Sequence, residues 1–87
     1  MPTISMFKGI IIKMNTKGEH NPPHFHAKYQ EYEAQFDFEG NLIKGELPNK
    51  QLKLVGAWAV LHTDELKANW ELMLENSPLY KIEPLRG

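Results

Sequence analysis

The chain has 87 residues, no cysteine and a formal net charge of −1 at pH 7. A chain of this length has material for one hydrophobic core, so we expect a single domain over residues 1–87 and a homodimer that adds to its modest stability. The lack of cysteine excludes disulfides, thiolate metal sites and a cysteine nucleophile. The sequence has no signal-peptide pattern and no apolar run near the roughly 20 residues of a membrane span, which predicts a cytoplasmic protein without a membrane segment.

Basic and acidic side chains are unevenly distributed along the chain. Residues 1–30 hold four lysines and one glutamate, whereas residues 31–87 hold six basic and ten acidic side chains. A basic segment can mark a nucleic-acid-binding face, but a typical DNA-binding domain is far more basic. The distribution therefore favours an ordinary protein surface and leaves nucleic acid open as a partner.

The first half of the chain, residues 1–47, predicts about four short strands. Residues 4–14 are apolar and β-branched and predict one strand with a bulge or sharp bend at Lys8-Gly9. A loop follows over residues 15–23. It ends in Pro22-Pro23, which forces an extended backbone there because proline restricts the residue before it.

Residues 24–29 and 32–38 alternate polar and apolar side chains, and they form a hairpin if Gln30-Glu31 is its two-residue turn. The aromatic and alanine side chains then share the core face, and the histidines share the solvent face with the charged residues. A short strand over residues 42–47 completes the sheet. The predicted cross-strand pairs are Tyr29 with Tyr32, Lys28 with Glu33, His26 with Gln35, and His24 with Asp37.

Residues 48–76 predict the helical part of the domain. Apolar residues recur every three or four positions from Leu52 to Met73, which favours one long helix over about residues 49–75. Thr63-Asp64 can also cap a second helix, so a kink near Thr63 is the alternative. The expected fold is α+β, with a small antiparallel sheet of about four strands and one long or kinked C-terminal helix packed on one face. Residues 77–87 form a C-terminal arm that docks through Leu79, Ile82 and Leu85.

The residues that stand out chemically are three histidines around the two prolines, His20, His24 and His26. Histidines two apart on a strand point to the same side, with Cα atoms roughly 6.7 Å apart. With Asp37 opposite His24, these side chains predict a metal site in which His24, His26 and Asp37 bind zinc, manganese or iron and His20 acts as ligand or proton shuttle. The alternatives are solvent-facing histidines that bind nothing, or that contact phosphate or transfer protons.

His62 falls on the apolar face of the predicted helix, which favours a hydrogen-bonded core histidine. If the helix packs on the Phe25 face, His62 lies across the sheet from the other histidines, whereas a register shift would bring it to them. Trp58 and Trp70 are predicted as anchors of the core or of a dimer interface. The candidate functional cluster comprises His20, His24, His26, Asp37 and His62.

The chain resembles the bacterial domain-of-unknown-function family 4160 over nearly its whole length. The resemblance rests on Met1-Pro2-Thr3-Ile4, on the motif from His20 to Ala27, and on the helical residues Trp58, His62, Glu65-Leu66 and Trp70. It implies that His24 and His26, with His20 and His62, are characteristic positions of the family. It also implies a small stand-alone protein that works with a second small protein, in an arrangement similar to toxin–antitoxin pairs.

The sequence carries no Walker loop, dinucleotide fingerprint or Ser-His-Asp pattern, so the enzyme classes that these motifs mark have no support. Three functional hypotheses remain. The leading hypothesis is a regulatory or toxin–antitoxin-type interaction protein with a small protein partner, which also leaves nucleic acid open. The second is a metal-dependent hydrolase or nuclease that uses the histidines. The third is a dimeric structural module whose interface is formed by Trp58, Trp70 and the C-terminal arm.

Overall fold

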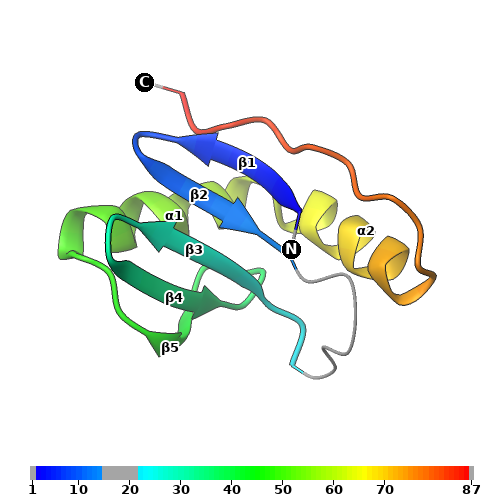
Figure 1. Cartoon of the computed structure of the whole chain (residues 1–87), viewed down its shortest axis with the longest axis horizontal. Helices are drawn as coiled ribbons and strands as arrows, with labels where there is room; N and C mark the ends of the chain where they lie inside the picture. The colour runs from blue at the N-terminus through cyan, green and yellow to red at the C-terminus, as the bar shows by residue number, and fades with distance from the viewer. Residues whose placement is uncertain (1, 15–21, 87) are drawn as a thin grey trace.

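The computed structural model describes residues 2–14 and 22–86 of the chain. Across these residues the backbone forms a five-stranded antiparallel sheet, in which each strand pairs with the next along the chain, followed by two helices and an irregular C-terminal arm (Figure 1). The fold class α+β is confirmed, with one strand more than expected. No helix in this part of the chain is long and apolar enough to cross a membrane. The elements are β1 (Thr3–Phe7), β2 (Ile10–Lys13), β3 (Phe25–Tyr29), β4 (Tyr32–Phe36), β5 (Leu42–Gly45), α1 (Asn49–Leu61) and α2 (Thr63–Leu74).

A tight hairpin joins β1 to β2, where the sequence predicted one strand with a bend. Lys8 and Gly9 both have positive φ, 49° and 79°, as in the two-residue turns that reverse a strand. Phe7 therefore pairs with Ile10, and the chain runs back antiparallel to itself. The bend is confirmed at the predicted residues, but the single strand over residues 4–14 is wrong.

The hairpin of β3 and β4 has the predicted register. Its turn is Gln30-Glu31, with Gln30 at a φ of 54°. The pairing ends at Phe25 and Phe36, one position before His24 would meet Asp37. Within the two strands the predicted pairs Tyr29 with Tyr32, Lys28 with Glu33 and His26 with Gln35 are confirmed.

The helical part divides into α1 and α2 at His62, so the continuous helix over residues 49–75 is wrong. His62 has φ −124° and ψ 26°, outside the helical range. The Thr63 hydroxyl makes no cap at the start of α2. It donates instead to the carbonyl oxygen of Phe38, at 2.8 Å, in the loop that follows β4. The break between the helices thus lies next to Thr63, the position at which the alternative prediction placed a kink.

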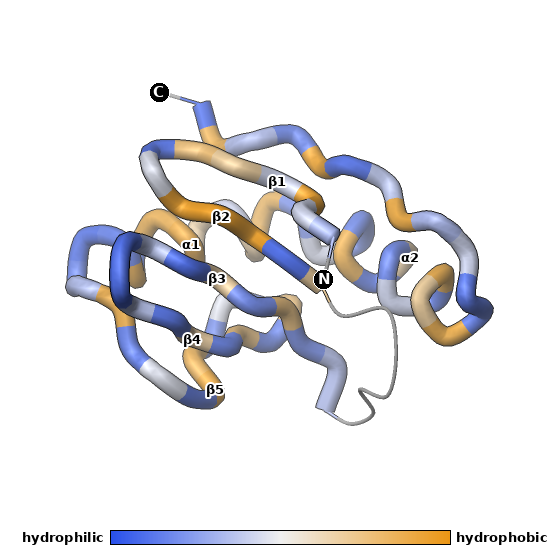
Figure 2. The backbone as a smooth tube through the Cα atoms, viewed as in Figure 1, coloured by the Kyte–Doolittle hydropathy of each residue, from blue (hydrophilic) through white to orange (hydrophobic). Residues whose placement is uncertain are grey.

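Both helices cover the same face of the sheet, and the hydrophobic core lies between these two layers (Figure 1). Trp58 of α1 is fully buried, with its ring centroid 5.5 Å from that of Phe7 and 5.6 Å from that of Phe25. The backbone tube is orange along most of β2 and largely blue along β3 and β4 (Figure 2), because β3 and β4 alternate core residues with polar ones. The strands contribute Ile4, Phe7, Ile10, Ile12, Phe25, Ala27, Ala34 and Phe36 to the core.

Trp58 and Trp70 belong to this core, which confirms the first of the two roles predicted for them. Trp58 is 0% exposed and Trp70 is 7% exposed. The ring of Trp70 packs edge-to-face on that of Phe38, with centroids 5.9 Å apart. Both indoles are therefore buried within their own chain. A homodimer stays a prediction.

The C-terminal arm, residues 77–86, docks on its own chain, as predicted. The side chain of Ile82 is buried, and its backbone N–H donates to the carbonyl oxygen of Ile4 on the edge strand β1, at 2.7 Å. Trp58 Nε1 donates to the carbonyl oxygen of Glu83 at 2.8 Å. The arm thus contacts both layers of the molecule, the sheet and the helices.

Asn69 of α2 holds the arm through both ends of its amide. The side chain is buried, its Nδ2 donates to the carbonyl oxygen of Tyr80, and its Oδ1 accepts from the backbone N–H of Tyr80, both at 2.9 Å. A buried amide whose donor and acceptor are both satisfied in this way contributes to stability and fixes the position of the arm.

We expect Asn69→Ala to lower the free energy of unfolding by about 2 kcal/mol, because it removes two hydrogen bonds and leaves the backbone groups of Tyr80 without these partners. Urea denaturation followed by tryptophan fluorescence measures this change. Lys67→Ala, at an exposed position of the same helix, should leave the unfolding midpoint nearly unchanged. An equal effect of both substitutions would contradict the assigned role of Asn69.

Candidate functional site

The predicted histidine segment lies at the start of β3. The rings of His24 and His26 are neighbours, with centroids 5.1 Å apart. His24 is nevertheless buried, because its ring also packs on that of Trp70, at 5.8 Å, and its Nδ1 donates to the carbonyl oxygen of Pro22, at 2.8 Å. The expected proximity of the two rings is confirmed, but the solvent-facing position of His24 is wrong. His20 lies outside the described residues.

Asp37 does not pair with His24, and its carboxylate is engaged in the loop between β4 and β5. It accepts hydrogen bonds from the backbone N–H groups of Glu39 and Asn41, both at 2.9 Å, and from Asn41 Nδ2 at 3.1 Å. Burial raises the pKa of the Asp37 carboxyl, and these hydrogen bonds lower the pKa by more, so that it lies below its ordinary value. Asp37 is therefore an anion that closes a turn.

His62 lies at the break between the helices, on the covered side of the sheet. Its ring packs on that of Trp58, with centroids 5.5 Å apart, and its Nδ1 donates to Glu65 Oε1 at 2.5 Å. The ring of His24 also packs on a helix, at Trp70 of α2, so the expectation that the sheet separates His62 from both of the other histidines stays a prediction. His62 is a hydrogen-bonded histidine at the edge of the core.

The described residues do not complete a metal site. Over residues 2–14 and 22–86, no group of three or more His, Asp or Glu side chains is arranged to hold an ion. His24 and His26 supply two neighbouring imidazoles, but Asp37 is engaged elsewhere and His62 lies in the other layer. Zinc or manganese binding by His24 and His26 therefore stays a prediction, and it requires a further ligand such as His20.

The face of the sheet turned away from the helices carries a row of polar side chains that crosses all five strands. We call this the open face; Figure 1 looks onto it, with the helices behind the sheet. Strand pairing aligns Thr3 with Lys13, Lys13 with His26, His26 with Gln35, and Gln35 with Lys44. A second row beside it consists of Met6, Ile11, Lys28 and Glu33.

Sequence reasoning found only the part of the open face that lies on β3 and β4. Lys13 was missed because its place depends on the turn at Lys8-Gly9, which the sequence analysis took for a bend. Lys44 was missed because β5 is shifted by a bulge: Gln35 pairs with Lys44, but Phe36 pairs with Leu42. The sequence held one indication of the position of Lys13, which is that this polar residue ends the apolar run Ile10-Ile11-Ile12.

Opposite charges are carried by the open face and by α2. The open face combines three lysines with one glutamate, whereas the exposed charges of α2 are mostly acidic. The described charges of the open face therefore sum to +2, whereas those of α2 sum to −2. The open-face charges are Lys13, Lys28, Lys44 and Glu33, and those of α2 are Asp64, Glu65, Glu71 and Lys67.

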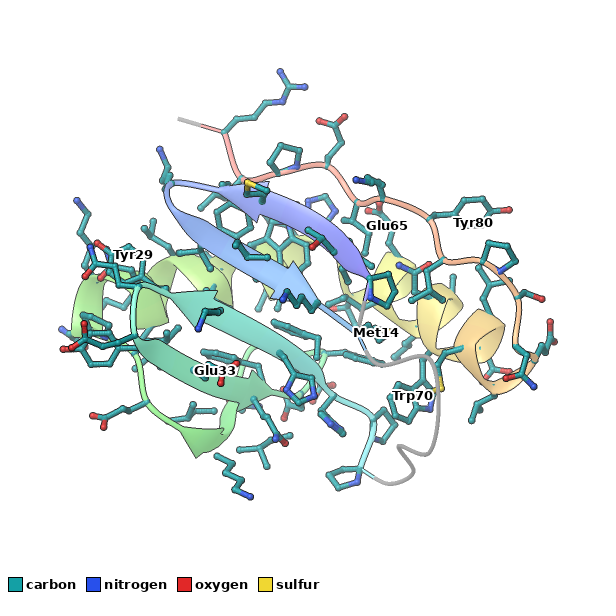
Figure 3. The ribbon with its side chains drawn as sticks, viewed as in Figure 1. Met14, Tyr29, Glu33, Glu65, Trp70 and Tyr80 are labelled. Atoms are coloured by element: carbon teal, nitrogen blue, oxygen red, sulfur yellow. The ribbon has the colours of Figure 1, made fainter. Side chains whose placement is uncertain are left out.

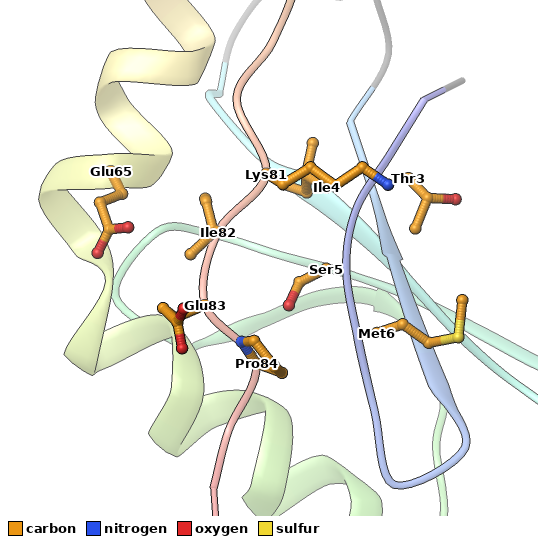
Figure 4. A pocket seen from close by; sticks show the side chains of 9 residues that line it. All are labelled: Thr3, Ile4, Ser5, Met6, Glu65, Lys81, Ile82, Glu83 and Pro84. Carbon is orange, nitrogen blue, oxygen red and sulfur yellow. The ribbon is translucent and has the colours of Figure 1, made fainter.

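One hollow of about 370 Å³ lies between β1 and the C-terminal arm (Figure 4). Its two carboxylates are already engaged, since Glu65 accepts from His62 and Glu83 accepts from Arg86 at 2.8 Å. The Ser5 hydroxyl is buried and has no hydrogen-bond partner among the described residues. Its carboxylates are thus engaged, while Lys81 and the buried Ser5 hydroxyl are polar groups on its lining that have no partner in the described part of the chain.

A second hollow of about 340 Å³ lies on the open face, and we call it the open-face hollow. Three polar side chains that line it, Glu33 (labelled in Figure 3), Gln35 and Lys44, make no hydrogen bond or ion pair with the described part of the chain. They are accordingly available to a ligand. The lining residues are His26, Glu33, Ala34, Gln35, Lys44 and Gly45.

The chain belongs to the family described as Domain of unknown function (DUF4160), whose model matches residues 9–71. The resemblance to this family is thereby confirmed. The matched part runs from the turn between β1 and β2 through most of α2, and it includes every lysine of the open face. The comparisons with curated proteins and with solved structures returned no match.

Proposed function

We propose that this chain is a small regulatory protein of the toxin–antitoxin type that binds nucleic acid through its open face. The observation that carries the proposal is the row of Lys13, His26, Gln35 and Lys44 across adjacent strands, with Lys28 beside it. Lysine ammonium groups bind phosphate oxygens and release counterions from the nucleic acid. The Gln35 amide adds directional hydrogen bonds.

The spacing of these groups suits an extended polyanion. Neighbouring strands lie about 4.8 Å apart, so that Lys13 on β2 and Lys44 on β5 are roughly 14 Å apart across the sheet. Lys28 projects from β3, between these two strands, in the adjacent row. A nucleic-acid strand laid across the sheet therefore passes several phosphates over cationic side chains. Because the sheet holds them, these side chains form one surface before any ligand binds.

A small protein partner is the second component of the proposal. Val60 and Leu61, at the end of α1, are apolar side chains with 61% and 68% of their surface exposed. Exposed apolar side chains next to each other are favourable contacts for a protein partner. Because α1 lies on the covered side of the sheet, a partner bound there leaves the open face accessible to nucleic acid.

We expect the double variant Lys28→Ala/Lys44→Ala to bind a single-stranded oligonucleotide about tenfold more weakly than the natural chain. The slope of log K against log salt concentration should also fall by about 1.4, because two phosphate contacts are lost. Fluorescence anisotropy at several salt concentrations measures both quantities. The matched control is Lys50→Ala/Lys53→Ala, which removes two exposed lysines from α1 and should leave both quantities unchanged. Equal losses in the two double variants would contradict a specific role of the open face.

A metal-dependent hydrolase or nuclease is the second candidate function. The observation in its favour is the 5.1 Å separation of the His24 and His26 rings, which allows both imidazoles to approach one ion. If this candidate holds, untagged protein incubated with zinc or manganese retains about one equivalent of metal, and His24→Ala/His26→Ala loses it. His62→Ala is the control that keeps the metal, since His62 packs on Trp58 in the other layer. Elemental analysis measures the bound metal in each protein. Absence of bound metal from the natural chain would exclude this candidate function.

A further inference from the structure

The open-face hollow has a base made of backbone, for a steric reason. Gly45 has a φ of 82°, and a Cβ atom at this position would lie 2.3 Å from the carbonyl oxygen of Glu33 and 2.9 Å from the Cα atom of Ala34. A side chain is therefore excluded there. Ala34 directs its methyl group into the core, so it also adds no bulk on the open face. Gly45 and Ala34 thus line the hollow without adding a bulky side chain to it.

The walls of the hollow carry complementary polar groups. The Glu33 carboxylate accepts hydrogen bonds, the Gln35 amide both donates and accepts, and Lys44 is a cation at the rim. His26 contributes an aromatic ring of the kind on which nucleic-acid bases stack. A volume of about 340 Å³ is near the lower end of the range of small-molecule pockets, about 300–1,000 Å³. This combination fits one planar heterocycle that carries hydrogen-bond donors on one edge.

We infer that the open-face hollow accepts one unpaired guanine, and this inference rests on the proposed function. A carboxylate offers two adjacent acceptors, and guanine presents two adjacent donors, N1–H and the 2-amino group, on its Watson–Crick edge. Adenine and cytosine each place an acceptor next to their amino group, and uracil places its N–H between two acceptors. Glu33 therefore selects guanine, the Gln35 amide can donate to its O6, and Lys44 binds the adjacent phosphate.

The same argument requires a single-stranded ligand. In a duplex the Watson–Crick edge is already paired and is not available to Glu33. Binding by stacking and edge recognition on an exposed sheet is the mode used for unpaired nucleotides. The proposed contacts of the hollow are with the base and the phosphate and not with the sugar, so we expect the preference for guanine in both RNA and DNA.

The test uses four uridine octamers that carry guanine, adenine, cytosine or uracil at the fifth position, and their thymidine equivalents in DNA. We expect the guanine octamer to bind the natural chain about tenfold more tightly than the other three, by fluorescence anisotropy at one salt concentration. Inosine in place of guanine removes the 2-amino group and should reduce this preference severalfold. The comparison of inosine with guanine uses only the natural chain, so it does not depend on the folding of a mutant.

Glu33→Gln should abolish the guanine preference while leaving the affinity for the uridine octamer unchanged or slightly higher, because a repulsive charge is lost. Glu31→Gln removes the same charge from the neighbouring turn and should keep the preference. Equal affinities for all four octamers, still weakened by Lys28→Ala/Lys44→Ala, would overturn the guanine site and leave the proposed function standing. Absence of binding to every octamer would overturn both.

Discussion

The structure depends on the burial of Trp58 between the helices and the sheet. Its ring contacts Phe7 on the edge strand and Phe25 in the central strand, and its Nε1 donates to the carbonyl oxygen of Glu83 in the arm. Removal of a buried tryptophan side chain costs about 3–5 kcal/mol, a large part of the total stability of a domain of this size. One side chain thus connects α1, two strands and the C-terminal arm, and it decides which face of the sheet is covered.

Which side chains form the open face is determined by which face of the sheet the helices cover. Because side chains alternate along a strand, each residue committed to the core places its neighbour on the other face. Lys13, His26 and Lys44 are aligned by strand pairing, not by attraction between them. A slip of β2 by one residue would turn Lys13 into the core, where an unpaired ammonium group is strongly unfavourable. Folding and the proposed binding surface therefore rely on the same register.

The sequence predicts the parts of this fold that are local. The hairpin around Gln30-Glu31 was predictable because alternation and a two-residue turn together determine its register. The turn at Lys8-Gly9 was not, since an almost continuous apolar run reads as one strand. The break between the helices at His62 was not predictable either, because apolar residues recur at helical spacing on both sides of it. The break is accompanied by a tertiary contact, the hydrogen bond from the Thr63 hydroxyl to the carbonyl oxygen of Phe38. At the site, the spacing of the histidines predicted their proximity, but not that Trp70 would bury His24 or that local amides would engage Asp37.

The most direct test of the central claim is chemical-shift mapping of the ¹⁵N-labelled chain during titration with a single-stranded octamer. The account predicts that the largest amide shift changes fall on β2 to β5, at Lys13, His26, Lys28, Gln35 and Lys44, while α2 and the arm change little. Shift changes concentrated on α2 or along the arm would contradict the assignment of nucleic-acid binding to the open face.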